Sequence, residues 1–232
     1  MSETVSISTL DGDESFSAYC ARPENEPRAA IVVIQEIFGV NAGIRRKCDR
    51  LAADGYLTLA PDLFWRLEPG VELDPDVDEQ FQRALALMGR FDQDQGVADI
   101  EATIRHARNA LGVAKVGAVG YCLGGRLAYM VAARTDADAS VGYYAVGIPD
   151  LMHEKHAIAN PLMLHLAGAD HFVPPEAQQA IHDGLDDHPK VTLHDYPGED
   201  HGFATEVGKR RSEVAAQLAD SRTAAFFAEH LG

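Results

Sequence analysis

The stretch Val119-Gly120-Tyr121-Cys122-Leu123-Gly124-Gly125 decides the fold prediction, because a buried strand changes into a helix within it. The apolar run at 115–121 is typical of a strand, and the run at 124–134 is typical of a helix. Cys122 therefore lies at a strand-to-helix turn. The pattern Gly-x-Cys-x-Gly matches the nucleophile elbow, which is most often written with serine in place of cysteine.

Strands and helices alternate along the rest of the chain. The predicted strands are two within 3–22, joined by a hairpin at Asp11-Gly12, and then 31–34, 56–60, 115–121, 140–144, 161–166 and 191–196. The predicted helices are 44–54, 77–88, 97–109, 124–134, 175–184 and 212–230. This alternation predicts an α/β fold with a mostly parallel central sheet, helices on both faces and an N-terminal β-hairpin. Because no linker or repeat interrupts it, we expect one domain over 1–232.

Composition narrows the classes of function. Asp and Glu number 36 against 20 Lys and Arg, which gives a net charge of -16. A surface of this sign repels nucleic acid and anionic membranes, so we expect neither as a partner. No apolar run is long enough to span a bilayer and no signal peptide is visible, so we expect a cytoplasmic protein. The odd number of cysteines, three, argues against a disulfide framework, and the absence of a CxxC pair argues against a zinc knot or a dithiol redox motif.

Cys122 has a chemical interpretation and a structural one. A helix that begins directly after it favours negative charge and so helps to stabilise a thiolate. The alternative is a small buried cysteine beside glycines that only a tight turn requires. Cys20 and Cys48 have neither flanking glycines nor a following helix start, so we interpret both as packing residues.

The partners of an elbow nucleophile favour the chemical interpretation. Asp170 and His201 each come just after a predicted strand, so both belong to the sheet edge that carries Cys122. The order nucleophile, acid, histidine is the one that this architecture requires. We therefore predict a catalytic triad of Cys122, Asp170 and His201. We expect His171 to be solvated or packed, and Asp200 to cap a turn.

These motifs resemble the dienelactone hydrolase family, and the resemblance covers nearly the whole chain. It is carried by Gln35-Glu36-Ile37-Phe38-Gly39-Val40-Asn41, Ala60-Pro61-Asp62-Leu63, Gly120-Tyr121-Cys122-Leu123-Gly124-Gly125, Val141-Gly142-Tyr143-Tyr144, Asp170-His171-Phe172-Val173-Pro174 and His201-Gly202-Phe203-Ala204. The resemblance implies an α/β-hydrolase fold and a Cys-His-Asp triad that cleaves ester or lactone bonds, with no metal and no organic cofactor. We expect a monomer that acts on a small molecule.

The resemblance also implies a role for Glu36. In such enzymes this glutamate holds the resting thiol neutral, and after substrate binds it helps to form the thiolate. Glu36 follows the strand at 31–34, in the loop that supplies one oxyanion donor in this fold. The alternative is a cap for the next helix. We expect the backbone N–H groups of Ile37 and Leu123 to bind the oxyanion.

The chain departs from the family at the substrate pocket. Family members of this type hold the substrate carboxylate with two arginines, and the aligned positions here are Phe81 and Thr205. Arg83 is rotated by roughly 200° along the helix, so we expect it to face away. Lys209, Arg210 and Arg211 could reach the site, but we favour a solvated face for this basic cluster at the start of a helix. Without bidentate anion contacts, carboxylated dienelactones are expected to be poor substrates.

Three aromatic residues complete the expected pocket, and two other functions stay open. Phe38, Tyr143 and Tyr144 are predicted either to line the pocket or to lie in the core. One alternative function is a carboxylesterase of neutral esters without preference for lactones. The other is a non-catalytic thiol-sensing or ligand-binding protein, because a fold does not determine a function.

Overall fold

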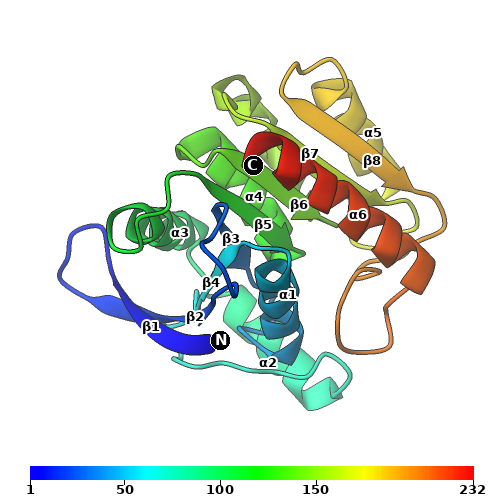
Figure 1. Ribbon diagram of the computed structural model, residues 1–232. Helices are drawn as coiled ribbons and strands as arrows, with labels where there is room; N and C mark the ends of the chain where they lie inside the picture. Colours follow the sequence, from blue (N-terminus) through cyan, green and yellow to red (C-terminus); the bar gives the residue numbers. More distant parts are fainter.

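The computed structural model describes residues 1–232 and contains one sheet of eight strands in the order β1-β2-β4-β3-β5-β6-β7-β8 (Figure 1). The strands are β1 (Ser2–Ser8), β2 (Ser15–Ala21), β3 (Ala30–Ile34), β4 (Leu57–Pro61), β5 (Val116–Tyr121), β6 (Ala139–Tyr143), β7 (Leu162–Ala167) and β8 (Val191–Tyr196). β3 to β8 are parallel, while β1 and β2 form an antiparallel hairpin that joins the sheet at β4. The predicted sheet and its hairpin are confirmed.

Helices cover both faces of this sheet. They are α1 (Ala42–Ala53), α2 (Asp78–Met88), α3 (Gln93–Asn109), α4 (Leu123–Arg134), α5 (Pro175–Leu185) and α6 (Glu213–His230). Alternate side chains of β3 divide between two cores. Ile31 and Val33 pack in the cluster that includes α1 and α6, and Val32 and Ile34 pack in the cluster that includes α3, α4 and α5. Figure 1 shows α6 crossing one face of β6 and β7.

Two helical segments differ from the sequence prediction. α3 begins at Gln93 rather than near Val97, because Asp92 caps it by accepting hydrogen bonds from the N–H groups of Asp94 and Gln95. A polar first turn of this kind gives no apolar periodicity to detect. A 3₁₀ segment, η1 (Ile148–Ala157), was not predicted; it follows β6 and packs against α4 and α5.

The parallel strands bring five loops to one edge of the sheet. The loops after β3, β5, β6, β7 and β8 carry, in turn, Glu36, Cys122, Tyr144, Asp170 and His201. Residues far apart in the sequence therefore meet at the carboxyl ends of the strands, where open α/β sheets bind ligands. None of the helices combines the length and the apolar character needed to cross a membrane.

Candidate active site

Cys122 occupies a tight turn between β5 and α4, with φ 56° and ψ -113°. An L-residue adopts this region of backbone conformation only when the surrounding structure holds it there. The flanking glycines explain how the turn closes. A Cβ on Gly120 would overlap the backbone of Gly124, and a Cβ on Gly124 would lie 2.5 Å from the carbonyl oxygen of Ile34. The strand-to-helix turn expected from the sequence is therefore present.

His201 and Asp170 form a buried pair beside this turn. His201 Nδ1 donates to Asp170 Oδ2 at 2.7 Å, and the other carboxylate oxygen accepts from the N–H of Phe172 at 2.8 Å. The rings of Tyr144 and Phe172 meet the imidazole edge to face, with centroids 5.1 and 4.9 Å away. The bond to Asp170 and the two rings hold the imidazole in one orientation, with Nε2 left for the nucleophile.

The electrostatics of His201 link it to Cys122, which lines the same cavity. Burial lowers the pKa of His201, but the Cys122 sulfur and the hydrogen bond to Asp170 outweigh burial and raise the pKa to about 10. An imidazole with a raised pKa keeps its proton at neutral pH when a thiolate forms beside it. A protonated His201 would therefore stabilise a negative charge on the neighbouring sulfur.

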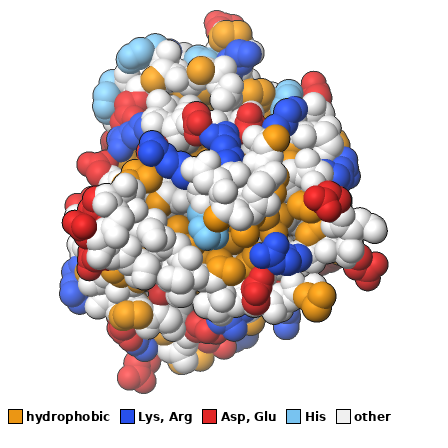
Figure 2. Space-filling view, turned by 60° about the vertical axis from the view of Figure 1, so that its left-hand side comes forward, with side chains coloured by type: hydrophobic (Ala, Val, Ile, Leu, Met, Phe, Trp, Pro, Cys, Tyr) orange, Lys and Arg blue, Asp and Glu red, His pale blue; other side chains and the backbone are white.

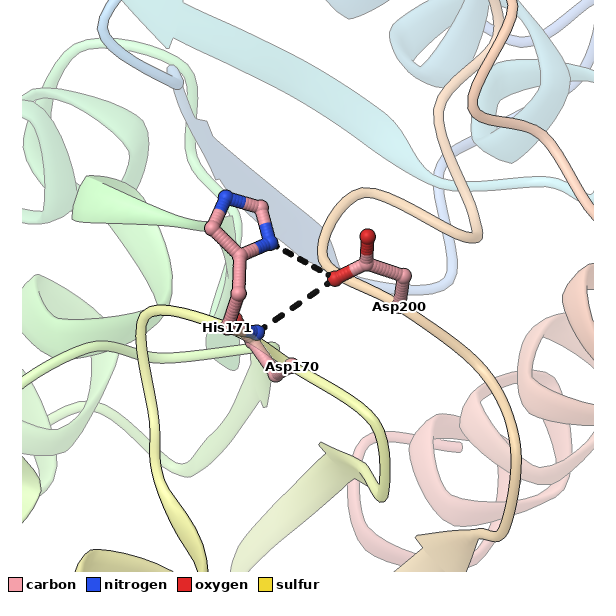
Figure 3. Close-up of side chains that lie close together, drawn as sticks. All are labelled: Asp170, His171 and Asp200. Atoms are coloured by element: carbon pink, nitrogen blue, oxygen red, sulfur yellow. Dashed lines mark hydrogen bonds and ion pairs between the residues drawn. The ribbon is translucent and has the colours of Figure 1, made fainter.

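A second set of contacts joins the loop after β7 to the loop after β8 (Figure 3). The side chains of Asp170, His171 and Asp200 lie close enough together to offer three ligand atoms to a metal ion. Asp200 Oδ1, however, accepts two hydrogen bonds from His171, one from its backbone N–H and one from its ring Nδ1. It also accepts a hydrogen bond from the backbone N–H of His201. Asp170 is already bound to His201. These groups therefore bind one another, and Asp200 links the two loops that carry the acid and the histidine.

Glu36 lies in the loop after β3, where it lines the same cavity as Cys122 and His201 and is only 9% exposed. Burial raises the pKa of this carboxyl group, and the charges of His201 and Lys47 oppose that rise. Tyr144, with φ 36°, donates its hydroxyl to Glu36 Oε1 at 3.4 Å. The alternative role as a helix cap is wrong, because Asn41 caps α1.

Ile37 and Leu123 line the same cavity as Cys122, and each has a backbone N–H group without a partner. Ile37 lines it, and its N–H has no acceptor among the protein's own groups. Leu123 also lines the cavity and is the first residue of α4, where an N–H has no acceptor within the helix. Both groups are thus available to bind an oxyanion that forms near Cys122.

The cavity above Cys122 has a volume of about 430 Å³, within the range of small-molecule sites. Its apolar wall is formed by Ile37, Phe38, Pro75, Phe81, Leu85, Met88, Leu123, Val146, Phe172 and Val207. Figure 2 shows a hollow with hydrophobic side chains on its floor, a histidine within it, and Lys and Arg side chains close by. A mostly apolar site of this size suits a small organic molecule.

The profile of the Dienelactone hydrolase family matches residues 16–231. The chain belongs to this family. It is 48% identical, over 97% of its length and 99% of the relative, to the "Putative carboxymethylenebutenolidase" of Azospirillum brasilense. It is 40% identical to the carboxymethylenebutenolidase of Pseudomonas putida, with 98% and 97% of the two chains covered. Among solved structures, a "Putative Dienelactone Hydrolase" from Klebsiella pneumoniae matches with a TM-score of 0.83 at 27% identity, over 99% of each chain.

Membership of the dienelactone hydrolase family confirms two predictions. The chain has the α/β-hydrolase fold, and it is a hydrolase of carboxylic ester or lactone bonds. The resemblance seen in the sequence is confirmed as well.

The aromatic residues that were expected at the pocket of this chain divide into two groups. Phe38 and Phe81 line the cavity, with ring centroids 5.9 Å apart. Tyr143 does not line it: the residue ends β6, is fully buried and shares a hydrogen bond of 2.6 Å with Thr223. Tyr144 does not line this cavity, but it contacts two residues that do, Glu36 and His201. Tyr143 is therefore a core residue.

Phe81 and Thr205, the two positions at which the resemblance implied arginine, both line the cavity. Arg83 faces away, as expected, and pairs with Glu68. Lys209 and Arg210, expected on a solvated face, are exposed but also line the cavity, and the Arg210 guanidinium lies 5.7 Å from the centroid of the Phe81 ring. The cavity mouth thus carries cations at positions other than the two expected.

Sequence reasoning missed one cation at the cavity. Arg126 lines it and donates to Gln93 and to the backbone carbonyl of Gly147. A signal was available, because Arg126 lies four positions after Cys122 and residues at that spacing share one helix face. These contacts occupy Arg126 with the protein's own groups.

Proposed function

We propose that this chain hydrolyses small carboxylic esters or lactones through a covalent acyl-cysteine at Cys122. The observation that carries the proposal is the buried His201–Asp170 bond of 2.7 Å beside an elbow cysteine on the floor of an apolar cavity. This constellation has the geometry of a nucleophile, a base and an orienting acid.

Acylation uses each group in turn. His201 Nε2 accepts the thiol proton of Cys122, and the thiolate attacks the carbonyl carbon of the substrate. The carbonyl oxygen becomes an oxyanion held by the N–H groups of Ile37 and Leu123. The oxyanion then collapses, the bond from carbon to the ester oxygen breaks, and His201 gives its proton to that oxygen. The products of this step are an acyl-cysteine and an alcohol, which stays attached to the acyl group when the substrate is a lactone.

Deacylation reverses the roles. A water molecule enters from the cavity, gives a proton to His201 and attacks the acyl carbon. The second oxyanion collapses, the carbon–sulfur bond breaks, and the proton returns to the Cys122 sulfur as the acid is released. Asp170 keeps its charge throughout and stabilises the imidazolium.

Glu36 controls when the thiolate forms. Its carboxyl group lies in the same cavity as Cys122, so a charged Glu36 disfavours a second negative charge on the sulfur. The buried position and the raised pKa of Glu36 support this role, because a small change in its surroundings alters its charge. Substrate that fills the cavity is such a change.

The wall of the cavity favours uncharged acyl groups. Neither Phe81 nor Thr205 offers a cation, and the lysine and arginine at the mouth are solvent-exposed. We therefore propose that neutral short-chain esters and uncharged lactones are cleaved at least as well as carboxylated dienelactones. A carboxylesterase without preference for lactones is the second candidate, and the mostly apolar wall favours it.

A substrate panel tests the proposal. Wild-type protein should give a burst of product from an activated aryl ester followed by steady turnover, and the ratio of kcat/KM for matched lactones and open esters decides between the two candidates. Cys122→Ala should abolish both phases, while Cys20→Ala should keep them. A wild-type protein that is alkylated at Cys122 but turns over no ester would identify a non-catalytic thiol protein instead.

A further inference from the structure

A second, much smaller cavity lies behind Glu36. Its volume is about 10 Å³, close to the smallest space that holds one water molecule. Glu36, Lys47, Tyr144 and Thr205 all line it, so the carboxyl group and the amine share this space. Thr205 Oγ1 is buried and has no hydrogen-bond partner, and the residue also lines the large cavity. The small cavity therefore lies between Glu36 and Lys47 of α1.

Lys47 is a buried cation on α1, with a side chain only 3% exposed. Its Nζ lies 3.1 Å from Glu206 Oε1 and 3.4 Å from Asp220 Oδ1. Arg50 pairs with the same two carboxylates, at 2.8 Å each, but its side chain is 39% exposed and does not line the small cavity. Of these two cations only Lys47 shares a cavity with Glu36.

We propose that Lys47 is a positioning residue for the reaction, and that it acts on Glu36 across the small cavity through a water molecule bound by Thr205. The hydroxyl of Thr205 supplies a polar partner for the water at the wall between the two cavities. This inference rests on the proposed function, because it assigns Lys47 a role only through the control of Cys122 by Glu36.

The charged and titratable groups around Glu36 come from every element packed against it. His201 follows β8, Tyr144 follows β6, Arg210 precedes α6 and Lys47 lies on α1, and Cys122 shares the large cavity. The charges of His201, Lys47 and Arg210 lower the pKa of Glu36 against the effect of burial. Tyr121 and Glu206 also line the small cavity. Lys47 alone among the cations approaches from the side away from substrate.

The test measures the rate of alkylation of Cys122 by iodoacetamide as a function of pH, with Cys20→Ala/Cys48→Ala as the parent. Glu36→Gln identifies the inflection that depends on Glu36, because that inflection is absent from the variant. Lys47→Met should move this inflection to higher pH by about one unit, since a nearby cation stabilises the carboxylate. Lys47→Arg keeps the charge and should restore most of the original profile.

Arg50→Met is the matched control. It removes the other cation of the same ion-pair cluster and should lower thermal stability without moving the inflection. In the Glu36→Gln background, Lys47→Met should leave the profile unchanged. Thr205→Val should move the inflection, whereas Thr205→Ser, which keeps the hydroxyl, should not.

Each result that would contradict the proposal can be recognised in the pH profile of alkylation. An inflection that disappears in Glu36→Gln but stays in place in Lys47→Met overturns the role of Lys47 and leaves that of Glu36 intact. A profile that Glu36→Gln does not alter overturns both roles. Equal movement in Lys47→Met and Arg50→Met would show a general loss of structure and would also overturn the inference.

Discussion

At the scale of single residues, Cys122 is held in an unfavourable conformation by its own backbone hydrogen bonds. Its N–H donates to the carbonyl of Tyr143 at 3.0 Å, and its carbonyl accepts from the N–H of Arg126 at 3.2 Å. The partners of these bonds lie in regular elements, Tyr143 at the end of β6 and Arg126 in α4. They hold the sulfur toward the cavity at a positive φ, and the core around these elements stabilises that strain.

The pKa of His201 gives a pH prediction. Because the imidazolium must give a proton to the leaving oxygen, kcat/KM should fall as the pH rises through about 10, where His201 loses that proton. Asp170→Asn removes one cause of the raised pKa, so the fall should begin at lower pH, and the rate at neutral pH should drop on the order of 10³–10⁴-fold. A pH–rate profile with background hydrolysis subtracted measures both effects. A high-pH limb that stays in place would show that Asp170 does not set the charge of His201.

Specificity gives a second prediction at this scale. Thr205→Arg should raise kcat/KM for a carboxylated lactone by roughly one to two decades, because a charge-assisted contact contributes about 1.5–3 kcal/mol. Its effect on a neutral ester should equal that of Thr205→Met, because both variants remove the hydroxyl that lines the small cavity beside Glu36. Thr205→Met, which has a long side chain without charge, is the control for size. If wild-type protein already strongly prefers the carboxylated lactone, and the preference weakens with salt, then Lys209 and Arg210 form the anion site.

At the scale of elements, close contact between α4 and β3 supports the elbow. Gly124→Ala would place a Cβ 2.5 Å from Ile34 O, and because that atom is backbone the helix must move away. We expect the free energy of unfolding to fall by about 1–3 kcal/mol and activity to fall with it. Gly89→Ala, at the end of α2, makes only ordinary contacts and should change neither. Denaturant unfolding and ester turnover measure the two quantities.

The elements that could be predicted were those with strong local patterns. β3 and β5 have continuous apolar runs and Cys122 has flanking glycines, so the sheet and the strand-to-helix turn at Cys122 were predictable. The start of α3 was not, because its first turn is polar. Tyr143 and Tyr144 could not be told apart, since the direction of each side chain depends on where β6 ends.

At the scale of the whole molecule, negatively charged side chains outnumber positively charged ones. Asp and Glu number 36 and Lys and Arg 20, so the net charge is -16. Repulsion among like charges destabilises the compact state, and salt screens it. Between about 10 mM and 300 mM NaCl we expect Tm to rise by roughly 2–4 °C, the shift that about 1 kcal/mol produces at this size. A fall in Tm would show that the surface ion pairs outweigh the repulsion.

Long-range contacts set the limit of what the sequence could show about the site. The Lys47–Asp220 bond joins residues 173 positions apart. Nothing local to Lys47 distinguishes it from a solvated lysine on α1, and its burial depends on α6 and on the loop that precedes it. The same loop places Lys209 and Arg210 at the cavity mouth, where the sequence left open both a solvated face and a reach into the site.

The segment between β8 and α6 carries His201 and also forms part of the cavity wall, with Thr205, Val207 and Arg210. Cys122 and Asp170 lie on other elements. A single mutation in this segment can therefore alter both the choice of substrate and the position of the base, His201. We expect relatives that evolved toward different substrates to diverge most here and on α2, while the ends of β5 and β7 stay alike. Directed evolution libraries confined to this segment should therefore often yield variants with new substrate selectivity. Each such variant should also show a change in kcat.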